Sequence, residues 1–255
     1  MCELLGISSK TPDDYKEILR EFFKHSYFNP HGWGMMYMSD GELKIARETV
    51  SANESEIIDD LICQLQKQKV LLAHIRYATV GSRRLENCHP FVRKDQSGRQ
   101  WIMIHNGTVY SGNMINKYAK CQSGDTDSER ILMCLMDAMN QAIDKNGGPL
   151  NEKQRFEVID RFVGEISPRN KVNLMIYDGE ILYAHKNMKN TLSFKRQNDG
   201  IILATKPLDD EGWIPLPMTR LLGFKAGKLI YQGTDHGNVF VSSLESITQY
   251  DAMHI

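Results

Sequence analysis

The most restrictive feature of this sequence is the grouping of its two longest helical patterns. Apolar residues recur at helical spacing over 127–146, and a second helical segment over 151–166 follows a Gly-Gly-Pro stop. Segments that suit strands precede and follow this pair instead of alternating with helices one by one. Because parallel βαβ units need a helix between successive strands, this order predicts an α+β protein with antiparallel sheets.

The remaining segments divide into shorter helices and strands. Helical spacing is present over 12–25 and 54–68, and Asp40-Gly41 and Asp178-Gly179 mark hairpin turns. Strands are expected over 2–8, 33–38, 42–50, 70–77, 90–93, 100–105, 171–185 (as a hairpin), 200–205 and 220–232. No composition break marks a linker, so residues 2–255 are expected to form a single domain, with 234–255 as a C-terminal tail.

The charge balance restricts the class of partner. The 255 residues carry 31 Lys and Arg against 32 Asp and Glu, a formal net charge of −1, without a run of five like charges. Proteins that bind nucleic acids or membrane surfaces need a field of one sign. No apolar run is long enough to span a bilayer. The expected partner is therefore a small molecule or another protein, with no nucleic acid and no membrane.

The cysteines argue against a disulfide scaffold. They are odd in number, widely spaced and without a CxxC pair: Cys2, Cys63, Cys88, Cys121 and Cys134. Reduced thiols and a cytoplasmic location are expected, also because the N-terminus lacks the regions of a signal peptide. The histidine and cysteine spacings match no zinc template and no glycine-rich nucleotide loop is present, so neither a metal nor another cofactor is expected.

Cys2 is the candidate nucleophile. Aminopeptidases remove Met1 when the second residue is small, and its loss would leave a cysteine with its own α-amine. The ordinary pKa of that amine is about 7.7–8.0 and that of a thiol about 8.5, so one residue would supply both nucleophile and base. The alternative is a small apolar residue on an edge strand. A retained Met1 would leave no free α-amine on Cys2.

Two charged residues suit recognition of a free amino acid. Arg76 ends a predicted strand and can direct two N–H groups at an α-carboxylate, the alternative being a surface ion pair. Asp127 begins the longest predicted helix and can accept hydrogen bonds from an α-ammonium. A structural alternative exists here too, because Thr126 and Glu129 fit a capping box and Asp127 complements the helix dipole.

Asn106 and Gly107 follow a predicted strand. One interpretation is a tight turn with Gly107 at positive φ. The other is an oxyanion hole made by the Asn106 amide and the Gly107 backbone N–H, where one donor is worth about 10²–10³ in rate. The segment 31–34 leaves a similar choice, between a glycine-lined wall of a site and a β-turn with a core tryptophan.

The order and spacing of these motifs resemble those of the class-II glutamine amidotransferases, in the N-terminal nucleophile hydrolase superfamily. The motifs are Met-Cys at 1–2, His-Gly-Trp-Gly at 31–34, His-Ile-Arg-Tyr-Ala-Thr at 74–79, His-Pro-Phe at 89–91, His-Asn-Gly at 105–107 and Gly-Asp-Thr-Asp-Ser-Glu at 124–129. Weaker matches over 177–184 and 204–213 resemble the stand-alone branch. The segment 31–34 departs from the arginine-containing segment of the synthase-fused members.

The resemblance implies a fold and a set of catalytic residues. The fold is a four-layer αββα sandwich of two antiparallel sheets between helix layers. Cys2 would be the nucleophile with its α-amine as base, and Asn106 and Gly107 would form the oxyanion hole.

The resemblance also implies substrate-binding residues. Arg76 would hold the α-carboxylate of glutamine and Asp127 its α-ammonium. Thr79 and His89 lie in family segments that line the pocket.

The implied reaction is hydrolysis of the side-chain amide of glutamine or a γ-glutamyl compound, through a γ-glutamyl thioester, with release of ammonia or an amine. Such a domain takes up nearly all of this length, so an ammonia acceptor is expected on a separate subunit or not at all; homo-oligomer formation is left open. One alternative is a catalytically silent glutamine-binding module. Another, metal hydrolysis through His74, His89, His105 and Cys88, matches no zinc spacing.

Overall fold

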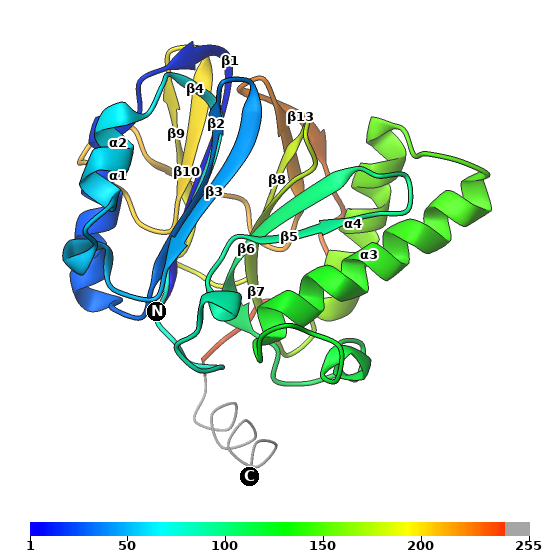
Figure 1. Cartoon of the computed structure of the whole chain (residues 1–255). Coiled ribbons are helices and arrows are strands. Elements are labelled where there is room, and N and C mark those ends of the chain that lie inside the picture. The colour runs from blue at the N-terminus through cyan, green and yellow to red at the C-terminus, as the bar shows by residue number, and fades with distance from the viewer. Residues whose placement is uncertain (243–255) are drawn as a thin grey trace.

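Two antiparallel β-sheets form the centre of the computed structural model, which describes residues 1–242 (Figure 1). The first sheet has the order β11-β9-β10-β1-β4-β2-β3, with β1 (Glu3–Asp13), β2 (Trp33–Ser39), β3 (Glu42–Glu48), β4 (Gln68–Ile75), β9 (Ser193–Gln197), β10 (Gly200–Ala204) and β11 (Ile214–Pro215). The second has the order β13-β12-β8-β7-β6-β5, with β5 (Phe91–Lys94), β6 (Gln100–Thr108), β7 (Lys171–Tyr177), β8 (Leu182–His185), β12 (Leu222–Lys225) and β13 (Lys228–Gln232).

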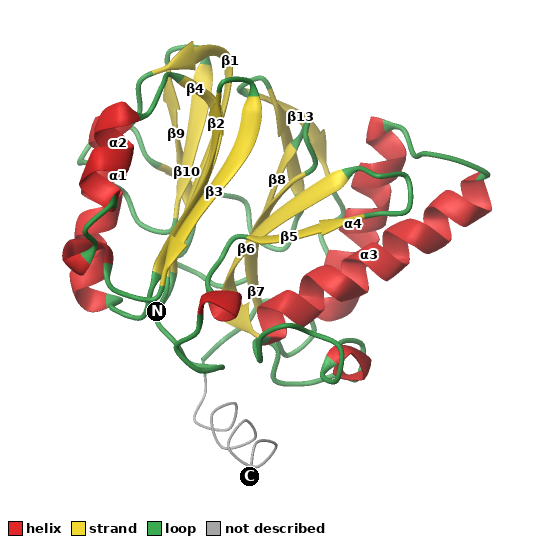
Figure 2. Ribbon diagram, viewed as in Figure 1, coloured by secondary structure: helices red, strands yellow, loops and turns green. Residues whose placement is uncertain are grey.

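Helices cover the outer face of each sheet (Figure 2). The first sheet carries α1 (Lys16–Lys24) and α2 (Ile58–Gln64), and the second carries α3 (Asp127–Asn146) and α4 (Glu152–Ile166). The resulting layer order confirms the expected αββα sandwich. Within residues 1–242, no helix combines the length and the hydropathy needed to cross a bilayer.

The strands are apolar on both faces, which explains the four layers. In β1, Leu5 and Ile7 join the apolar cluster under α1 and α2, whereas Leu4 joins the cluster between the two sheets. In β4, Leu71 packs toward the helices and Leu72 between the sheets. Because successive side chains of a strand point to opposite faces, every second position of these strands reaches the layer between the sheets.

Most predicted elements are present, with shifted ends. The helix 127–146 and the two predicted hairpins match α3, β2–β3 and β7–β8. The predicted helices 12–25 and 54–68 are too long, because β1 continues to Asp13 and β4 already begins at Gln68. The sequence patterns also miss β9 and β11, whose side chains are half-buried or exposed. Of the predicted tail, 243–255 lies outside the described residues.

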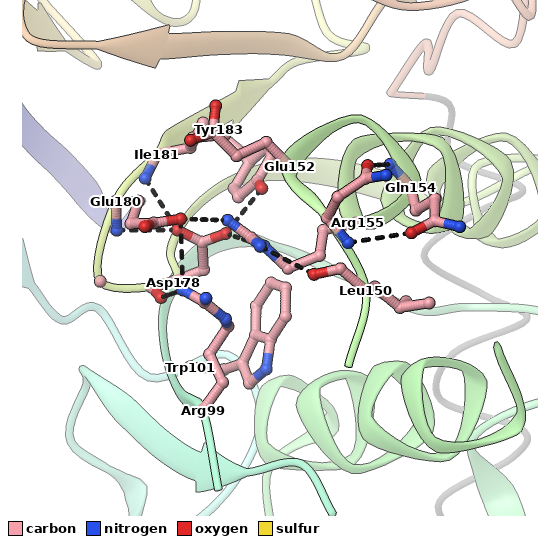
Figure 3. A network of polar contacts seen from close by, with 12 residues as sticks. Arg99, Trp101, Leu150, Glu152, Gln154, Arg155, Asp178, Glu180, Ile181 and Tyr183 are labelled. Atoms are coloured by element: carbon pink, nitrogen blue, oxygen red, sulfur yellow. Dashed lines mark hydrogen bonds and ion pairs between the residues drawn. The ribbon is translucent and has the colours of Figure 1, made fainter. Parts of the chain in front are cut away.

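An ion-pair network around the buried Arg155 fastens α4 to the turn between β7 and β8 (Figure 3). Arg155 Nε donates to Asp178 Oδ2 at 2.7 Å, and its Nη2 donates to Glu180 Oε2 at 2.5 Å. A third bond runs from Arg155 Nη1 to the carbonyl of Leu150, and the Tyr183 hydroxyl donates to Asp178 Oδ2 at 2.8 Å. The Arg155 charge is therefore matched by carboxylates.

Candidate active site

In the first sheet, the start of β1 lies beside the end of β4. Leu4 pairs with His74 in this antiparallel ladder, and continuing the register by two residues places Cys2 opposite Arg76. Since Leu4 faces the layer between the sheets, strand alternation directs the Cys2 side chain to the same layer. The predicted nucleophile is thereby placed at one end of the sandwich.

In the second sheet, the end of β6 lies beside the start of β7. Ile104 and Met175 are paired and both face the layer between the sheets, so Asn106 and Lys171 are directed there as well. Lys171 Nζ lies 3.0 Å from Asn106 Oδ1 and 3.1 Å from Met1 Sδ. This lysine therefore connects the N-terminus in one sheet with the His-Asn-Gly segment in the other.

The Cys2 thiol is held by the chain that follows β4. Its Sγ accepts a hydrogen bond from the Tyr77 backbone N–H at 3.2 Å and lies 3.3 Å from the Tyr77 carbonyl oxygen. Burial raises the pKa of the Cys2 thiol, while the Tyr77 backbone, the α-amine, Lys171 and Arg76 act in the opposite direction. The surrounding positive charge thus favours the thiolate against the desolvation that opposes it.

Met1 carries the α-amine in this structure. That amine donates to Asn29 Oδ1 at 3.2 Å, and burial lowers its pKa, with Lys171 contributing in the same direction. While Met1 is present, the nitrogen of Cys2 is a peptide nitrogen and cannot act as a base. The nucleophile-plus-base arrangement requires removal of Met1.

Asn106 and Gly107 lie inside β6, so the tight-turn interpretation is wrong. They pair with Asn173 and Val172 of β7, and Gly107 is not among the residues with positive φ. A Cβ atom at position 107 would lie 1.9 Å from the Lys171 carbonyl oxygen. Glycine is required here by close packing of β6 on β7, which is a contact between distant parts of the chain.

The backbone N–H of Gly107 points away from β7. Val172, the residue opposite, donates its own N–H to Asn187 Oδ1 at 2.8 Å, and its carbonyl oxygen lies 2.7 Å from His185 Nδ1. Both backbone groups of Val172 therefore face away from β6, as in a pair that shares no backbone hydrogen bond. Gly107 is left with an N–H directed to the other side of β6.

Arg76 is buried, so the surface-ion-pair interpretation is wrong. Its Nη1 donates to the carbonyl of Ser82, and its Nη2 donates to those of Val80 and Gly81, each at 3.1 Å. Among residues 1–242, no carboxylate lies within 4 Å of this guanidinium. Three of its five N–H donors thus hold the loop that follows Tyr77, and the charge is not neutralised.

A cavity of about 370 Å³ lies beside this loop. Asp127 and Arg130 of α3, Val80, and residues 109–113 after β6 contribute to its walls. The Asp127 side chain is buried, and its Oδ2 accepts the Val109 N–H at 2.8 Å. The carboxylate of Asp127 and the guanidinium of Arg130 thus line one cavity, and this pair of opposite charges suits a free amino acid.

The capping interpretation of the same segment holds only in part. The Thr126 hydroxyl accepts the Glu129 N–H at 3.3 Å, as a helix cap does. The Glu129 carboxylate instead accepts the backbone N–H groups of Ser123 and Gly124. Capping is therefore assigned to Thr126 and leaves Asp127 free to line the cavity.

The resemblance places Thr79 and His89 at the pocket, but neither residue lines the 370 Å³ cavity. Thr79 is exposed on the loop after β4. His89 is buried with His74, the ring centroids being 4.0 Å apart, and neither ring lines the 370 Å³ cavity. Burial lowers the pKa of His74 to about 3 and that of His89 well below its ordinary value, so both are neutral at physiological pH.

The segment 31–34 combines features of both interpretations. Trp33 is fully buried in the core under α1 and α2, but it begins β2 instead of lying in a turn. His31 Nδ1 accepts the Ala78 N–H at 2.8 Å, and its ring lies 5.0 Å from that of Tyr77. This histidine therefore supports the stretch of chain that holds Cys2.

No metal centre is found in the part of the chain that the structure describes, where no three His, Cys, Asp or Glu side chains are arranged to hold an ion. His105, from the metal alternative, has Nδ1 at 2.9 Å from Ser128 Oγ, and Cys88 Sγ contacts the Glu48 carbonyl. The cysteines at positions 2, 63, 88, 121 and 134 are free thiols.

Sequence reasoning missed two cations of the site. Lys171 begins an otherwise largely apolar strand, where one polar residue suggests only a strand end. Arg130 lines the cavity three residues after Asp127, on the same side of α3, and its Nε is buried without a hydrogen-bond partner in the described residues. The spacing of three was a usable signal for Arg130, since residues three apart in a helix are neighbours.

Comparison with known proteins gives the family. Residues 1–198 match the family model described as class-II glutamine amidotransferases. An uncharacterized protein of Methanocaldococcus jannaschii is 28% identical over 91% of this chain and 71% of its own length. The gamma-glutamyl-hercynylcysteine sulfoxide hydrolase of Mycolicibacterium smegmatis is 24% identical over 81% of this chain and 83% of its own.

A solved structure supports the fold. The glutamine phosphoribosylpyrophosphate amidotransferase of B. subtilis is similar with a TM-score of 0.66 at 15% identity, over 90% of this chain and 48% of that one. This chain therefore spans about half the length of that enzyme. Since the family model covers 198 of the 255 residues, the chain belongs to the class-II glutamine amidotransferases.

Proposed function

We propose that this chain hydrolyses the side-chain amide of glutamine, or the γ-glutamyl amide of a larger compound, with Cys2 as nucleophile after loss of Met1. The observation that carries the proposal is the convergence of Cys2, Asn106 and Lys171 at one end of the layer between the sheets. The loop that holds the thiol also borders the cavity lined by Asp127. Nucleophile, oxyanion donors and amino-acid pocket are thus neighbours.

The first half of the reaction forms a thioester. The Cys2 thiolate attacks the δ-carbonyl carbon, a C–S bond forms, and the carbonyl electrons move to oxygen. Asn106 Nδ2–H and the Gly107 N–H donate to this oxyanion. The C–N bond then breaks, and the protonated α-amine of Cys2 transfers its proton to the departing nitrogen.

The second half is hydrolysis of the thioester. The α-amine of Cys2 takes a proton from water as the water oxygen attacks the thioester carbonyl. The same two donors stabilise the second oxyanion, and its collapse breaks the C–S bond. Glutamate leaves and the thiolate is restored.

In the proposed binding mode the two charges of the amino acid are held by Asp127, which lines the cavity, and by Arg76, which holds the loop beside it. The Asp127 carboxylate receives the α-ammonium, and the buried Arg76 guanidinium receives the α-carboxylate through the donors that the Val80–Ser82 carbonyls leave unused. The charge of Arg76 is available because no carboxylate neutralises it in the described part of the chain.

The substrate is either glutamine, with ammonia passed to a separate subunit, or a γ-glutamyl compound that is only hydrolysed. The relative from M. smegmatis is named for hydrolysis of a γ-glutamyl compound, which favours the second substrate class. Turnover of γ-glutamyl amides above that of glutamine would support it. Pull-down of a stable acceptor subunit would support the first.

The test is turnover of glutamine and of γ-glutamyl amides by chain whose intact mass shows the loss of Met1. Cys2→Ala should abolish both activities, whereas Cys63→Ala, which removes an exposed thiol, should leave them unchanged. Equal activity of wild type and Cys2→Ala would overturn the proposal. A wild type that keeps Met1 and is stabilised by glutamine without turnover would identify a silent binding module instead.

A further inference from the structure

Lys171 is a buried cation without a counter-ion. Its side chain lies at the start of β7, and no carboxylate lies within 4 Å of its Nζ among residues 1–242. Its two contacts are Met1 Sδ and Asn106 Oδ1. Removal of Met1 eliminates the first, so the mature chain keeps the contact with Asn106. A buried unpaired charge is costly to the fold, which points to a role in function.

The contact determines how the Asn106 amide is turned. An ammonium group has only donors, so the amide must present its oxygen to Lys171 Nζ and its nitrogen elsewhere. Asn106 Nδ2 is buried and has no hydrogen-bond partner within the described chain. A buried N–H group without an acceptor destabilises the fold, unless a ligand supplies that acceptor. The contact with Lys171 thus leaves the Nδ2–H group of Asn106 available to a ligand.

Lys171 also acts on the thiol by charge. Its ammonium opposes the rise in the Cys2 pKa that burial causes, together with the α-amine and Arg76, which are the other positive groups facing the thiol. Burial lowers the pKa of Lys171, whereas the nearby Cys2 raises it. Thiolate and ammonium therefore stabilise one another across the two sheets.

We propose that Lys171 is a positioning residue of the amide hydrolysis: it orients the Asn106 amide toward the oxyanion and places a positive charge beside Cys2. This inference rests on the proposed function, and it adds a component that the motifs of the family resemblance did not include. Its two consequences, on kcat and on thiol reactivity, are measured separately.

The first test is a double-mutant cycle. Lys171→Met should lower kcat about 100-fold, as the loss of one oxyanion donor does, with KM changed less than about twofold. Because the orienting role acts through Asn106, Lys171→Met combined with Asn106→Ala should be little slower than Asn106→Ala alone when both are assayed above the pH at which Cys2 forms its thiolate. Lys186→Met is the matched control, since this equally buried lysine donates to the Thr191 and Leu192 carbonyls instead. Additive losses, or an unchanged kcat of Lys171→Met, would overturn the proposal.

The second test does not need turnover. Alkylation of Cys2 by iodoacetamide, followed over a pH series by mass spectrometry of the N-terminal peptide, gives the midpoint of thiolate formation. The peptide is measured because the exposed Cys63 and Cys121 react as well. Lys171→Met should move that midpoint to higher pH, while Lys171→Arg, which keeps a cation, and Lys186→Met should leave it in place. An unmoved midpoint in Lys171→Met would overturn the electrostatic part, even if the chain proves to have no amidase activity and the proposed function fails.

Discussion

Arg155 and Arg76 are both buried arginines, but their surroundings differ. Arg155 bonds to Asp178 and Glu180, so its charge is neutralised where α4 meets the β7–β8 turn (Figure 3). Arg76 bonds to three backbone carbonyls, and nearby Lys171 bonds to an amide oxygen and a thioether. The first region satisfies its charge internally, and the second does not.

The difference separates a structural use of buried charge from a functional one. A buried ion pair contributes little net stability, but removal of one partner leaves an uncompensated charge. At the candidate site the uncompensated cations are already present, and the anions that would balance them are a thiolate, an oxyanion and a substrate carboxylate. We therefore expect substitutions at the first region to affect folding and those at the second to affect turnover.

The largest effect is expected from Arg155→Met. It leaves Asp178 buried without its cation, so the free energy of unfolding should fall by about 3–5 kcal/mol. Urea denaturation measures this loss. Activity per folded molecule should stay at the wild-type level, and a variant that keeps its stability but loses turnover would contradict the comparison.

Asn106→Ala should have the opposite effect: a large loss of turnover with little loss of stability. Removal of one oxyanion donor should lower kcat about 10²–10³-fold, equivalent to about 2.7–4 kcal/mol in the activation barrier. Steady-state kinetics measure this loss of kcat. Urea denaturation of the same variant should show a smaller change in the free energy of unfolding than that of Arg155→Met. A large loss of stability with an unchanged kcat would assign Asn106 to the fold.

Asp127→Asn should mainly weaken binding. The amide oxygen can still accept the Val109 N–H, but the negative charge for the substrate ammonium is lost, so KM should rise about tenfold, or about 1.4 kcal/mol. Asp137→Asn is the matched control on the same helix, because Asp137 pairs with Lys117 and Tyr118 instead. Equal changes of KM in the two variants would show that Asp127 does not bind the substrate ammonium.

The smallest effect concerns Glu3, a neutralised carboxylate one residue from Cys2. Burial alone would raise its pKa, but hydrogen bonds from His25 at 2.7 Å and Lys206 at 2.6 Å outweigh burial and lower it. A folded pKa below the ordinary value gives stability that is present above pH 4.5 and is lost as pH falls through the folded pKa. Glu3→Gln should remove this part of the acid sensitivity. Thermal unfolding between pH 3 and 6 tests it, and an equally steep decline in both proteins would contradict it.

The sequence is sufficient for most of the fold, because the periodicity of α3 and the hairpin turns are local signals. It also indicates Cys2, Arg76, Asn106 and Asp127 as candidates, because those residues stand in motifs. It does not reveal that Gly107 is required by the Lys171 carbonyl, or that Lys171 contacts Asn106, since both contacts join residues more than 60 positions apart. The strands β9 and β11, at one end of the first sheet, escape prediction for a different reason: their half-buried or exposed side chains carry little apolar pattern.

Intact mass spectrometry of the chain after reaction with an electrophilic analogue of glutamine tests whether Cys2, freed by the loss of Met1, is the nucleophile. The expected result is a chain without Met1 that takes up one adduct, located on Cys2, and no adduct on Cys2→Ala. An adduct on another cysteine, or full reaction of chain that still carries Met1, would contradict it.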